Sequence, residues 1–227
     1  MGKEKYKIAV VDDEALFRNG IEMLINDHEQ LSSHIMASDG NDFLHQLNTS
    51  PVDLPDALLC DLEMPNMDGV ELTKILSEEF PAIKVIVLSS HYEAELILKM
   101  IEIGASAFMP KDEETDEFHQ TIIHVIEKEF YYNHFIVKSI REKMLFGSKN
   151  KKNELMEFTL REKEILALLC QQKTNKEIGA ELFISSRTVE GHRKKLLTKT
   201  NSKNTAGLII FAIEQGLHQI DIHKSGW

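Results

Sequence analysis

Residues 8–14 read IAVVDDE, and this stretch decides the fold of the first half of the chain. Four apolar residues, typical of a strand that is buried on both faces, lead directly into three acidic residues. Neighbouring carboxylates repel one another, and they cost stability unless a cation compensates their charge. The stretch therefore predicts a buried strand that ends at a polar site.

Apolar runs like this one recur over the first 130 residues and alternate with stretches of helical spacing. The runs are 6–11, 35–37, 57–60, 85–88 and 107–109. The first helical stretch is marked by Leu16, Phe17, Ile21, Leu24 and Ile25, and later ones begin near Val70, Leu96 and Phe118. Five strands that alternate with helices predict a doubly wound parallel sheet with helices on both faces.

Polar residues follow several of these strands. They are Asp12, Asp13 and Glu14 after the first, Asp61 after the third, Ser89 at the end of the fourth and Lys111 after the fifth. Carboxyl ends of parallel strands meet at one edge of the sheet, where such folds bind ligands. Each residue alone is explained as a solvated group at a strand end, but together they predict one site. Its hard oxygen ligands suit Mg²⁺.

The stretches VVDDE, DLEMPNMDG, VLSSH and GASAFMPKD, in this order, resemble the receiver domain of two-component response regulators across residues 1–130. The resemblance implies a flavodoxin-like sheet of strand order 2-1-3-4-5, with Asp61 phosphorylated by a sensor histidine kinase. The further roles it implies are Mg²⁺ binding by Asp12, Asp13, Asp61 and the backbone carbonyl of Glu63, a switch at Ser89 and Phe108, and phosphoryl contact by Lys111.

Two positions depart from the receiver pattern, because many receivers carry threonine where Ser89 stands and tyrosine where Phe108 stands. Both departures bear on the coupling of phosphorylation to shape change rather than on phosphorylation itself. Gly69, in the loop after Asp61, is expected to permit a backbone conformation that a side chain would resist. His91 is read as a loop residue, with tuning of phosphoryl hydrolysis as the alternative.

Charge is spread unevenly along the 227 residues, whose net charge is −11. Residues 1–152 carry a net charge of −13 and residues 153–227 a net charge of +2, which indicates two parts with different partners. We expect a receiver over 1–130, a connector helix and flexible linker over 131–154, and a second domain over 155–227. No apolar run approaches the roughly 18 residues of a membrane span, so we expect a cytoplasmic protein without a membrane partner.

Short helices alone are predicted from Phe158 onward. Capping-box spacing occurs at Thr159–Glu162 and at Thr174–Glu177. A tight turn at 183–184 precedes a third helix, capped by Ser185 or Ser186 and reaching about Thr200, and a fourth helix runs from 204 or 205 to near 216. Two short helices with a tight turn between them predict a helix-turn-helix domain.

The segment from Arg187 to Lys203, which contains most of the third helix, carries six basic residues and one acidic residue. At about 100° per residue, Val189, Leu196 and Thr200 face the core, while Arg187, Gly191, Lys194, Lys195 and Thr198 face outward. A basic outward face with a glycine suits the major groove of DNA, although a solvated charged helix face also explains the basic residues alone.

FTLREKEILALL, TNKEIGAELFISSRTVEGHRKKLL and NTAGLIIFAIEQGL resemble the LuxR/NarL-type helix-turn-helix domain across residues 155–217. The resemblance implies a recognition helix near 186–200 and a last helix that pairs two protomers. The candidate DNA-binding residues are Arg187, Thr188, Glu190, Gly191, Arg193, Lys194, Lys195 and Lys199. The candidate dimerisation residues are Ile209, Ile210 and Ile213.

The whole chain thus resembles a transcriptional response regulator, not an enzyme, that dimerises on phosphorylation and binds double-stranded promoter DNA. Two alternatives stay open. One is a Mg²⁺-dependent phosphatase, because Glu63 lies two places after the candidate nucleophile, although no substrate cap is visible. The other is a DNA-binding protein whose receiver is not controlled by phosphate.

Overall fold

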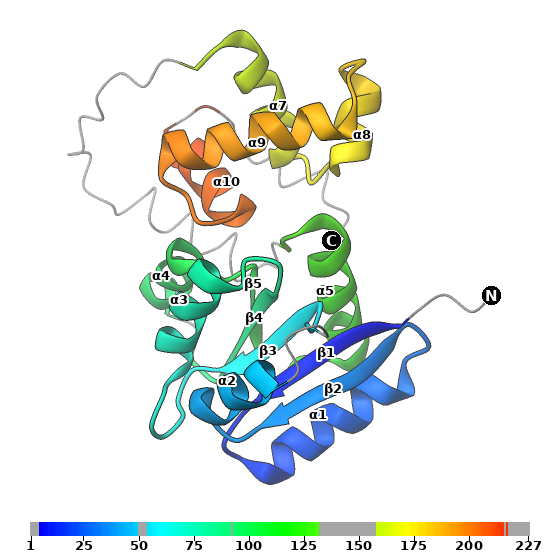
Figure 1. The fold of residues 1–227 in the computed structure, drawn as a ribbon, viewed down its shortest axis with the longest axis vertical. Helices are drawn as coiled ribbons and strands as arrows, with labels where there is room; N and C mark the ends of the chain where they lie inside the picture. The colour runs from blue at the N-terminus through cyan, green and yellow to red at the C-terminus, as the bar shows by residue number, and fades with distance from the viewer. Residues whose placement is uncertain (1–4, 50–53, 92, 132–157, 216, 218–227) are drawn as a thin grey trace. The chain divides into compact units, whose positions relative to one another are not determined.

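The computed structural model describes residues 5–49, 54–91, 93–131, 158–215 and 217 (Figure 1). The chain divides into two compact units, residues 1–139 and 140–227, and each is described here by itself. The predicted connector and linker, 131–154, lie outside the described residues except for Tyr131. That residue is buried in the core of the first unit.

The first unit contains a five-stranded sheet in which every paired strand is parallel (Figure 1). Its strands are β1 (Tyr6–Val11), β2 (Leu31–Ala37), β3 (Ala57–Asp61), β4 (Lys84–Ser89) and β5 (Ala107–Pro110). The strand order is β2-β1-β3-β4-β5, which confirms the predicted doubly wound sheet. β2 begins four residues before its predicted start, because half-buried polar residues at this edge of the sheet extend it.

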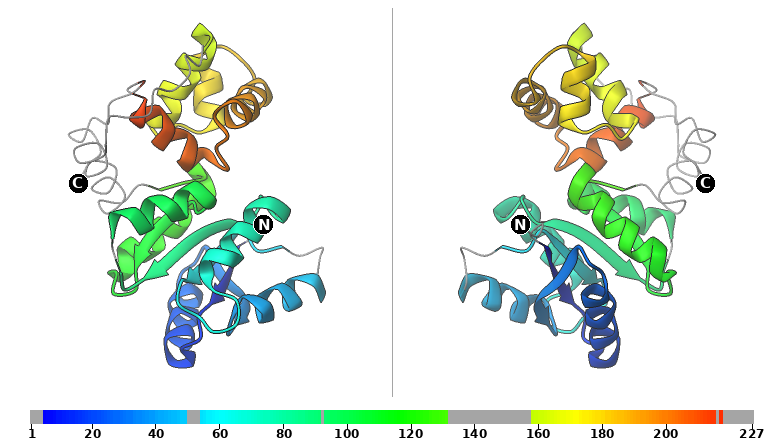
Figure 2. Two further views of the ribbon diagram at one scale, coloured as in Figure 1. Left: turned by 90° about the vertical axis from the view of Figure 1, so that its left-hand side faces the viewer. Right: turned by 90° about the vertical axis from the view of Figure 1, so that its right-hand side faces the viewer.

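Helices cover both faces of the sheet (Figures 1 and 2). They are α1 (Ala15–Asp27), α2 (Gly40–Thr49), α3 (Gly69–Glu79), α4 (Ala94–Ile103) and α5 (Thr115–Lys128). α1 and α5 share one face, and α2, α3 and α4 share the other. The prediction that Leu16 marks the packed face of α1 was wrong, since its side chain is 88% exposed and Ile21 and Ile25 make the packing.

The run IAVV in β1 is buried on both sides of the sheet. Ile8 and Val10 join the apolar cluster under α1 and α5, while Ala9 and Val11 point to the opposite face and are equally buried. A strand with two buried faces needs an uninterrupted apolar run, and the polar residues can begin only where the strand ends. The core therefore fixes the point at which the acidic residues leave the sheet.

The second unit is helical, as predicted. Its helices are α7 (Leu160–Cys170), α8 (Asn175–Glu181), α9 (Ser186–Thr200) and α10 (Thr205–Glu214). Both predicted capping boxes are present at the starts of α7 and α8, and Ser185 and Asn204 cap α9 and α10. Each cap satisfies backbone N–H groups that the first helical turn leaves without partners. No helix in the described part of the chain is both long and apolar enough to cross a membrane.

Candidate functional site

Three carboxylates meet at the carboxyl edge of the sheet. Asp12 and Asp13 directly follow β1, and Asp61 ends β3, which pairs with β1 so that Val11 lies opposite Cys60. One oxygen of each carboxylate lies within 4.8 Å of the others. Asp12 and Asp61 are buried, whereas Asp13 is exposed and leaves the cluster open to solvent.

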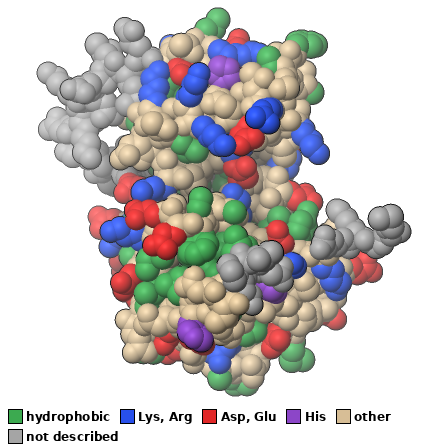
Figure 3. Space-filling view, in the orientation of Figure 1, with side chains coloured by type: hydrophobic (Ala, Val, Ile, Leu, Met, Phe, Trp, Pro, Cys, Tyr) green, Lys and Arg blue, Asp and Glu red, His purple; other side chains and the backbone are tan. Residues whose placement is uncertain are grey.

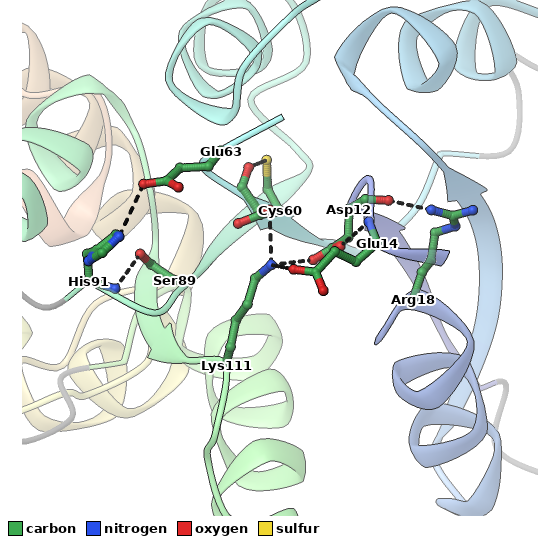
Figure 4. Close-up of polar contacts among 9 residues, drawn as sticks. Asp12, Glu14, Arg18, Cys60, Glu63, Ser89, His91 and Lys111 are labelled. Atoms are coloured by element: carbon green, nitrogen blue, oxygen red, sulfur yellow. Dashed lines mark hydrogen bonds and ion pairs between the residues drawn. The ribbon is translucent and has the colours of Figure 1, made fainter. Parts of the chain in front are cut away.

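Lys111 binds two of these carboxylates at once (Figure 4). Its Nζ lies 2.9 Å from Oδ2 of Asp12 and 3.0 Å from Oδ2 of Asp61. The backbone N–H of Lys111 donates to the carbonyl oxygen of Ser89 at 3.1 Å, and this hydrogen bond holds the backbone of Lys111 beside the end of β4. The structure thus brings together four of the predicted site residues: Asp12 and Asp13 directly after β1, Asp61 at the end of β3 and Lys111 directly after β5.

The charged groups in this cluster shift one another's pKa values. Burial raises the pKa of the Asp61 carboxyl above its ordinary value, and the contact with Lys111 opposes that rise only in part. Burial also opposes the charged form of Lys111, but its hydrogen bonds and charge interactions with Asp12 and Asp61 outweigh that effect and raise its pKa. Lys111 therefore keeps its positive charge beside Asp61, where added negative charge would be stabilised.

The sequence did not reveal the neighbours that hold this cluster in place. The carboxylate of Asp12 accepts the backbone N–H of Glu14 at 2.8 Å, and the guanidinium of Arg18 donates to the backbone carbonyl of Asp12. Nζ of Lys111 also lies 4.8 Å from the ring centre of Phe17, a cation–π contact. The sequence predicts only a core position for Phe17 and gives no signal for Arg18, because both contacts depend on the direction in which α1 leaves the loop.

A side chain at position 69 would be resisted, as predicted, and the cause is a close approach of the backbone rather than a positive φ. Among the described glycines only Gly104 has a positive φ, so Gly69 adopts an ordinary backbone conformation. A Cβ at position 69 would instead lie 2.1 Å from the carbonyl oxygen of Asp61. The N–H of Gly69 donates to the carbonyl of Leu62 at 3.1 Å, so the loop returns directly onto the end of β3.

The two predicted switch residues lie on neighbouring strands. Ser89 is buried at the end of β4 and Phe108 is fully buried in β5, where it lies opposite Val87. Oγ of Ser89 accepts the backbone N–H of His91 at 3.0 Å. The structure therefore holds the hydroxyl at the same strand edge as the acidic cluster.

The side chain of Glu63 lies away from the acidic cluster. Its Oε1 is 3.4 Å from Nε2 of His91, and 75% of the Glu63 side chain is exposed (Figure 4). A phosphatase that uses Asp61 as nucleophile would need this second acid beside the reacting group. The geometry does not favour that alternative.

An exposed polar face runs along α9. It consists of Arg187, Thr188, Glu190, Gly191, Lys194, Lys195 and Thr198. Glu190 and Lys194 form an ion pair at 2.9 Å on the surface, and no atom lies within 4 Å of a Cβ built at Gly191. Several Lys and Arg side chains gather over the helical unit on the face drawn in Figure 3. Most of the predicted DNA-binding residues are therefore accessible.

Two predicted DNA-binding residues, Arg193 and Lys199, lie on α9 but outside this exposed face. Arg193 is only 8% exposed and donates to Oδ1 of Asn175 at 2.6 Å and to the hydroxyl of Thr205. Because Arg193 follows Val189 by four positions, it shares the inward face of α9 and links α8 to α10. Lys199 is half-buried, since its Nζ lies 2.8 Å from a carboxylate oxygen of Glu162. We correct the placement of both residues, because they hold the domain together rather than offer a free cation.

The predicted dimerisation residues Ile209, Ile210 and Ile213 are buried within the chain itself. α10 packs against α7 and α9, and its apolar circumference is larger than a surface helix would need because little of it is on the surface. Pairing of two protomers through these side chains stays a prediction.

Comparison with known proteins agrees with both halves of the chain. Residues 8–123 match the family described as the response regulator receiver domain, and residues 156–212 match the family described as bacterial regulatory proteins of the luxR family. The chain therefore belongs to the response regulators of two-component systems, with a receiver followed by a LuxR-type DNA-binding domain. The LuxR-type domain places the chain among transcriptional regulators.

Individual relatives match over nearly the whole chain. The chain is 30% identical to the uncharacterized transcriptional regulatory protein YhcZ of Bacillus subtilis strain 168, over 93% of this chain and 97% of that protein. It is 27% identical to the transcriptional regulatory protein DegU of Brevibacillus brevis, over 95% and 96%. Among solved structures, the response regulator ChrA of a heme-sensing two-component system is 26% identical, covers 96% of this chain and all of that one, and gives a TM-score of 0.50.

Proposed function

We propose that Asp61 accepts a phosphoryl group from a sensor histidine kinase, and that this modification controls dimerisation and promoter binding. The observation that supports the proposal most strongly is the geometry around Asp61. Its buried carboxylate lies beside two further aspartates, and Lys111 binds both Asp61 and Asp12 at about 3 Å. The kinase and the dimer follow from the family rather than from this geometry.

In the proposed reaction a carboxylate oxygen of Asp61 attacks the phosphorus atom of a phosphohistidine. A phosphorus–oxygen bond forms, the phosphorus–nitrogen bond breaks, and the histidine nitrogen leaves with the electron pair and takes up a proton. The protein contributes position and charge, because little other covalent chemistry is needed for phosphoryl transfer. Lys111 lies where its ammonium group can bind an oxygen of the transferred phosphoryl group.

The donor set at this edge suits Mg²⁺. The oxygens of three aspartates are close enough to share one ion, and the exposure of Asp13 leaves room for water ligands. We assign the binding to Asp12, Asp13, Asp61 and the backbone carbonyl of Glu63. When bound, Mg²⁺ supplies positive charge that neutralises the transferring oxygens.

Ser89 and Phe108 are proposed to report the modification to the rest of the chain. Oγ of Ser89 already accepts one hydrogen bond from His91, so its own O–H can donate to a phosphoryl oxygen. Phe108 lies on the neighbouring strand β5, fully buried and opposite Val87, two residues before Ser89. A small displacement of Ser89 toward the phosphoryl group would therefore be followed by the ring and would bias a two-state receiver.

DNA binding is assigned to the exposed face of α9, with Arg187, Lys194 and Lys195 as the cations that reach phosphates or bases. YhcZ and DegU are named as transcriptional regulatory proteins, and ChrA is described as the response regulator of a two-component system.

We propose that the receiver spans 1–130 and the DNA-binding domain 155–227, and that 131–154 connects them. We also propose that the protein acts in the cytoplasm, where promoter DNA lies.

The decisive experiment is intact mass spectrometry of the full-length protein after incubation with Mg²⁺ and acetyl phosphate. We expect one phosphoryl adduct on the wild type and none on Asp61→Asn. Lys111→Ala should form the adduct more slowly, whereas Lys84→Ala, at the opposite end of β4, should behave as the wild type. An adduct that persists in Asp61→Asn would contradict the assignment of the phosphoacceptor.

The alternative in which phosphate does not control the receiver makes a different prediction. If Asp61→Asn binds a promoter duplex as tightly as the wild type treated with acetyl phosphate, phosphorylation is not the switch. If only the treated wild type gains affinity and sediments as a dimer, the proposed control is supported.

A further inference from the structure

The turn between α8 and α9 is unusually tight. The backbone N–H of Ile184 donates to the carbonyl of Gly179 at 2.9 Å, and a Cβ built at Gly179 would lie 2.7 Å from the carbonyl oxygen of Ile184. Arg161 donates to the carbonyl of Leu182 at 2.8 Å. These hydrogen bonds hold the turn against the end of α8 and against α7.

Phe183 occupies the left-handed position of this turn, with a φ of +54°. The hydrogen bond from Ile184 back to Gly179 marks a helix end of the type in which this position is usually glycine and sometimes asparagine. A bulky residue in the left-handed region is strained, because its Cβ crowds the backbone. The backbone therefore gives no reason for a phenylalanine here.

Packing gives no reason either. The side chain of Phe183 is 94% exposed, the largest value among the large hydrophobic residues of the described chain. It contributes almost nothing to the core of the helical unit, while its apolar surface remains in water. An exposed ring on a strained backbone therefore motivates the hypothesis that Phe183 contacts a partner outside the chain.

The position of Phe183 indicates what that partner is. Two residues later, Ser185 caps α9 by accepting the N–H of Thr188 at 3.0 Å, and Arg187 and Thr188 are exposed in the first turn. In helix-turn-helix proteins the first residues of the recognition helix enter the major groove. Phe183 therefore stands two residues before the N-cap of α9, the end of the helix that is proposed to approach DNA.

We infer that Phe183 is a DNA-contacting residue whose ring packs against apolar surface beside the major groove. This inference rests on the proposed function, because it requires that α9 binds DNA. Two parts of DNA offer the required apolar surface, the methyl group of thymine and the carbon face of the deoxyribose. Both contacts are uncharged, so they add affinity without the release of counterions.

The test uses the full-length protein treated with acetyl phosphate and Mg²⁺, and a duplex that the wild type selects from a random-sequence library. In Phe183→Asn the side chain suits the left-handed backbone, so we expect an equal or higher melting temperature together with about tenfold weaker binding. The slope of log affinity against log salt should stay unchanged, because no charge is removed. Leu160→Ala, which shortens a side chain that is 77% exposed at the start of α7, is the matched control and should bind as the wild type.

Replacement of thymine by deoxyuridine in the selected duplex distinguishes a contact with thymine methyl groups from a contact with deoxyribose. If the wild type loses affinity on the deoxyuridine duplex and Phe183→Asn does not, the ring contacts thymine methyl groups. If neither protein distinguishes the duplexes, while the variant is weaker on both, the contact is to deoxyribose. Either result supports the inference.

Several results would overturn it. Wild-type affinity in Phe183→Asn, with weakened binding in Arg187→Ala, would remove Phe183 from the interface and leave DNA binding by α9 intact. Wild-type DNA affinity combined with a loss of transcription would assign the ring to a protein partner instead. A lower melting temperature in both Phe183→Asn and Phe183→Ala would show a structural role. A wild type that selects no duplex would overturn the proposed function as well.

Discussion

A methyl group at position 69 would lie 2.1 Å from the carbonyl oxygen of Asp61, whereas a methyl group at Gly191 would meet no atom within 4 Å. We expect Gly69→Ala to lower the free energy of unfolding by about 1–3 kcal/mol, because the loop must move away from β3. It should also slow formation of the phosphoryl adduct. Gly191→Ala should raise stability by up to about 1 kcal/mol, because alanine favours the helix. Chemical denaturation of the full-length proteins measures both effects, and equal stabilities would contradict the prediction.

Arg193 and Lys194 are neighbours in α9 with opposite expected roles. Arg193→Ala removes the hydrogen bonds to Asn175 and Thr205, and should cost about 2–3 kcal/mol of stability. Lys194→Ala should change stability by less than about 0.5 kcal/mol but weaken DNA binding and reduce the salt slope by about one. Thermal unfolding and salt-dependent binding separate the two. If Arg193→Ala folds as stably as the wild type, the structural role assigned to it is wrong.

Spacing was enough to predict the residues that gather at strand ends, but not the residues that support them. Asp12, Asp61 and Lys111 meet because any parallel sheet of this order brings those ends together. Arg193 and Phe183 depend instead on the packing of one helix against another and on a single backbone angle. No pattern in the sequence reports either property.

At the scale of elements, α7 and α9 are joined by an ion pair with a defined pH dependence. The hydrogen bond from Lys199, together with the backbone N–H of Thr159, lowers the pKa of Glu162 from its ordinary 4.5. A carboxyl group whose pKa is lower in the folded state stabilises the fold above its unfolded pKa, and that contribution is lost as the pH falls through the folded pKa.

We therefore expect the melting temperature of the helical unit to fall as the pH drops below about 4.5, and Glu162→Gln to weaken that dependence. At neutral pH the same substitution should cost about 1–2 kcal/mol. Circular dichroism melts across this pH range measure both effects. Glu164→Gln, at an exposed position on the same helix, is the matched control. An unchanged pH profile in Glu162→Gln would contradict the role of the pair.

How well each helix or strand could be predicted from the sequence depended on its local chemistry. β1 has the predicted bounds because it is apolar on both faces and stops at charged residues. The starts of α7 and α8 were predicted correctly because each capping box is a local motif. α2 carried no clear signal, since only Phe43 and Leu47 among its large side chains are buried. Local chemistry can be read from sequence, whereas a helix with a thin apolar face is defined mainly by the sheet it covers.

At the scale of the whole molecule, a divalent ion should stabilise the receiver and leave the helical unit unaffected. At a Mg²⁺ concentration about 100 times the dissociation constant, binding adds about 2.7 kcal/mol to the stability of the receiver. Calorimetry should therefore show one transition that rises with Mg²⁺ and one that does not. In Asp13→Asn the rise should shrink, while the unfolding temperature without Mg²⁺ should increase, because one of the three repelling charges is gone. A Mg²⁺ effect on both transitions would contradict an ion held by the acidic cluster alone.

The two outer strands of the sheet have a consequence for the protein at high concentration. β5 has only four residues and ends at a proline, and the pairing of β2 with β1 is irregular between Ile8 and Val10. A short strand that ends at a proline, and an edge strand whose pairing with its neighbour is irregular, are poor templates for a strand from another molecule. We therefore expect these two edge strands to limit sheet-to-sheet association between newly made copies in a crowded cell, even though the strands between them, β1, β3 and β4, are largely apolar.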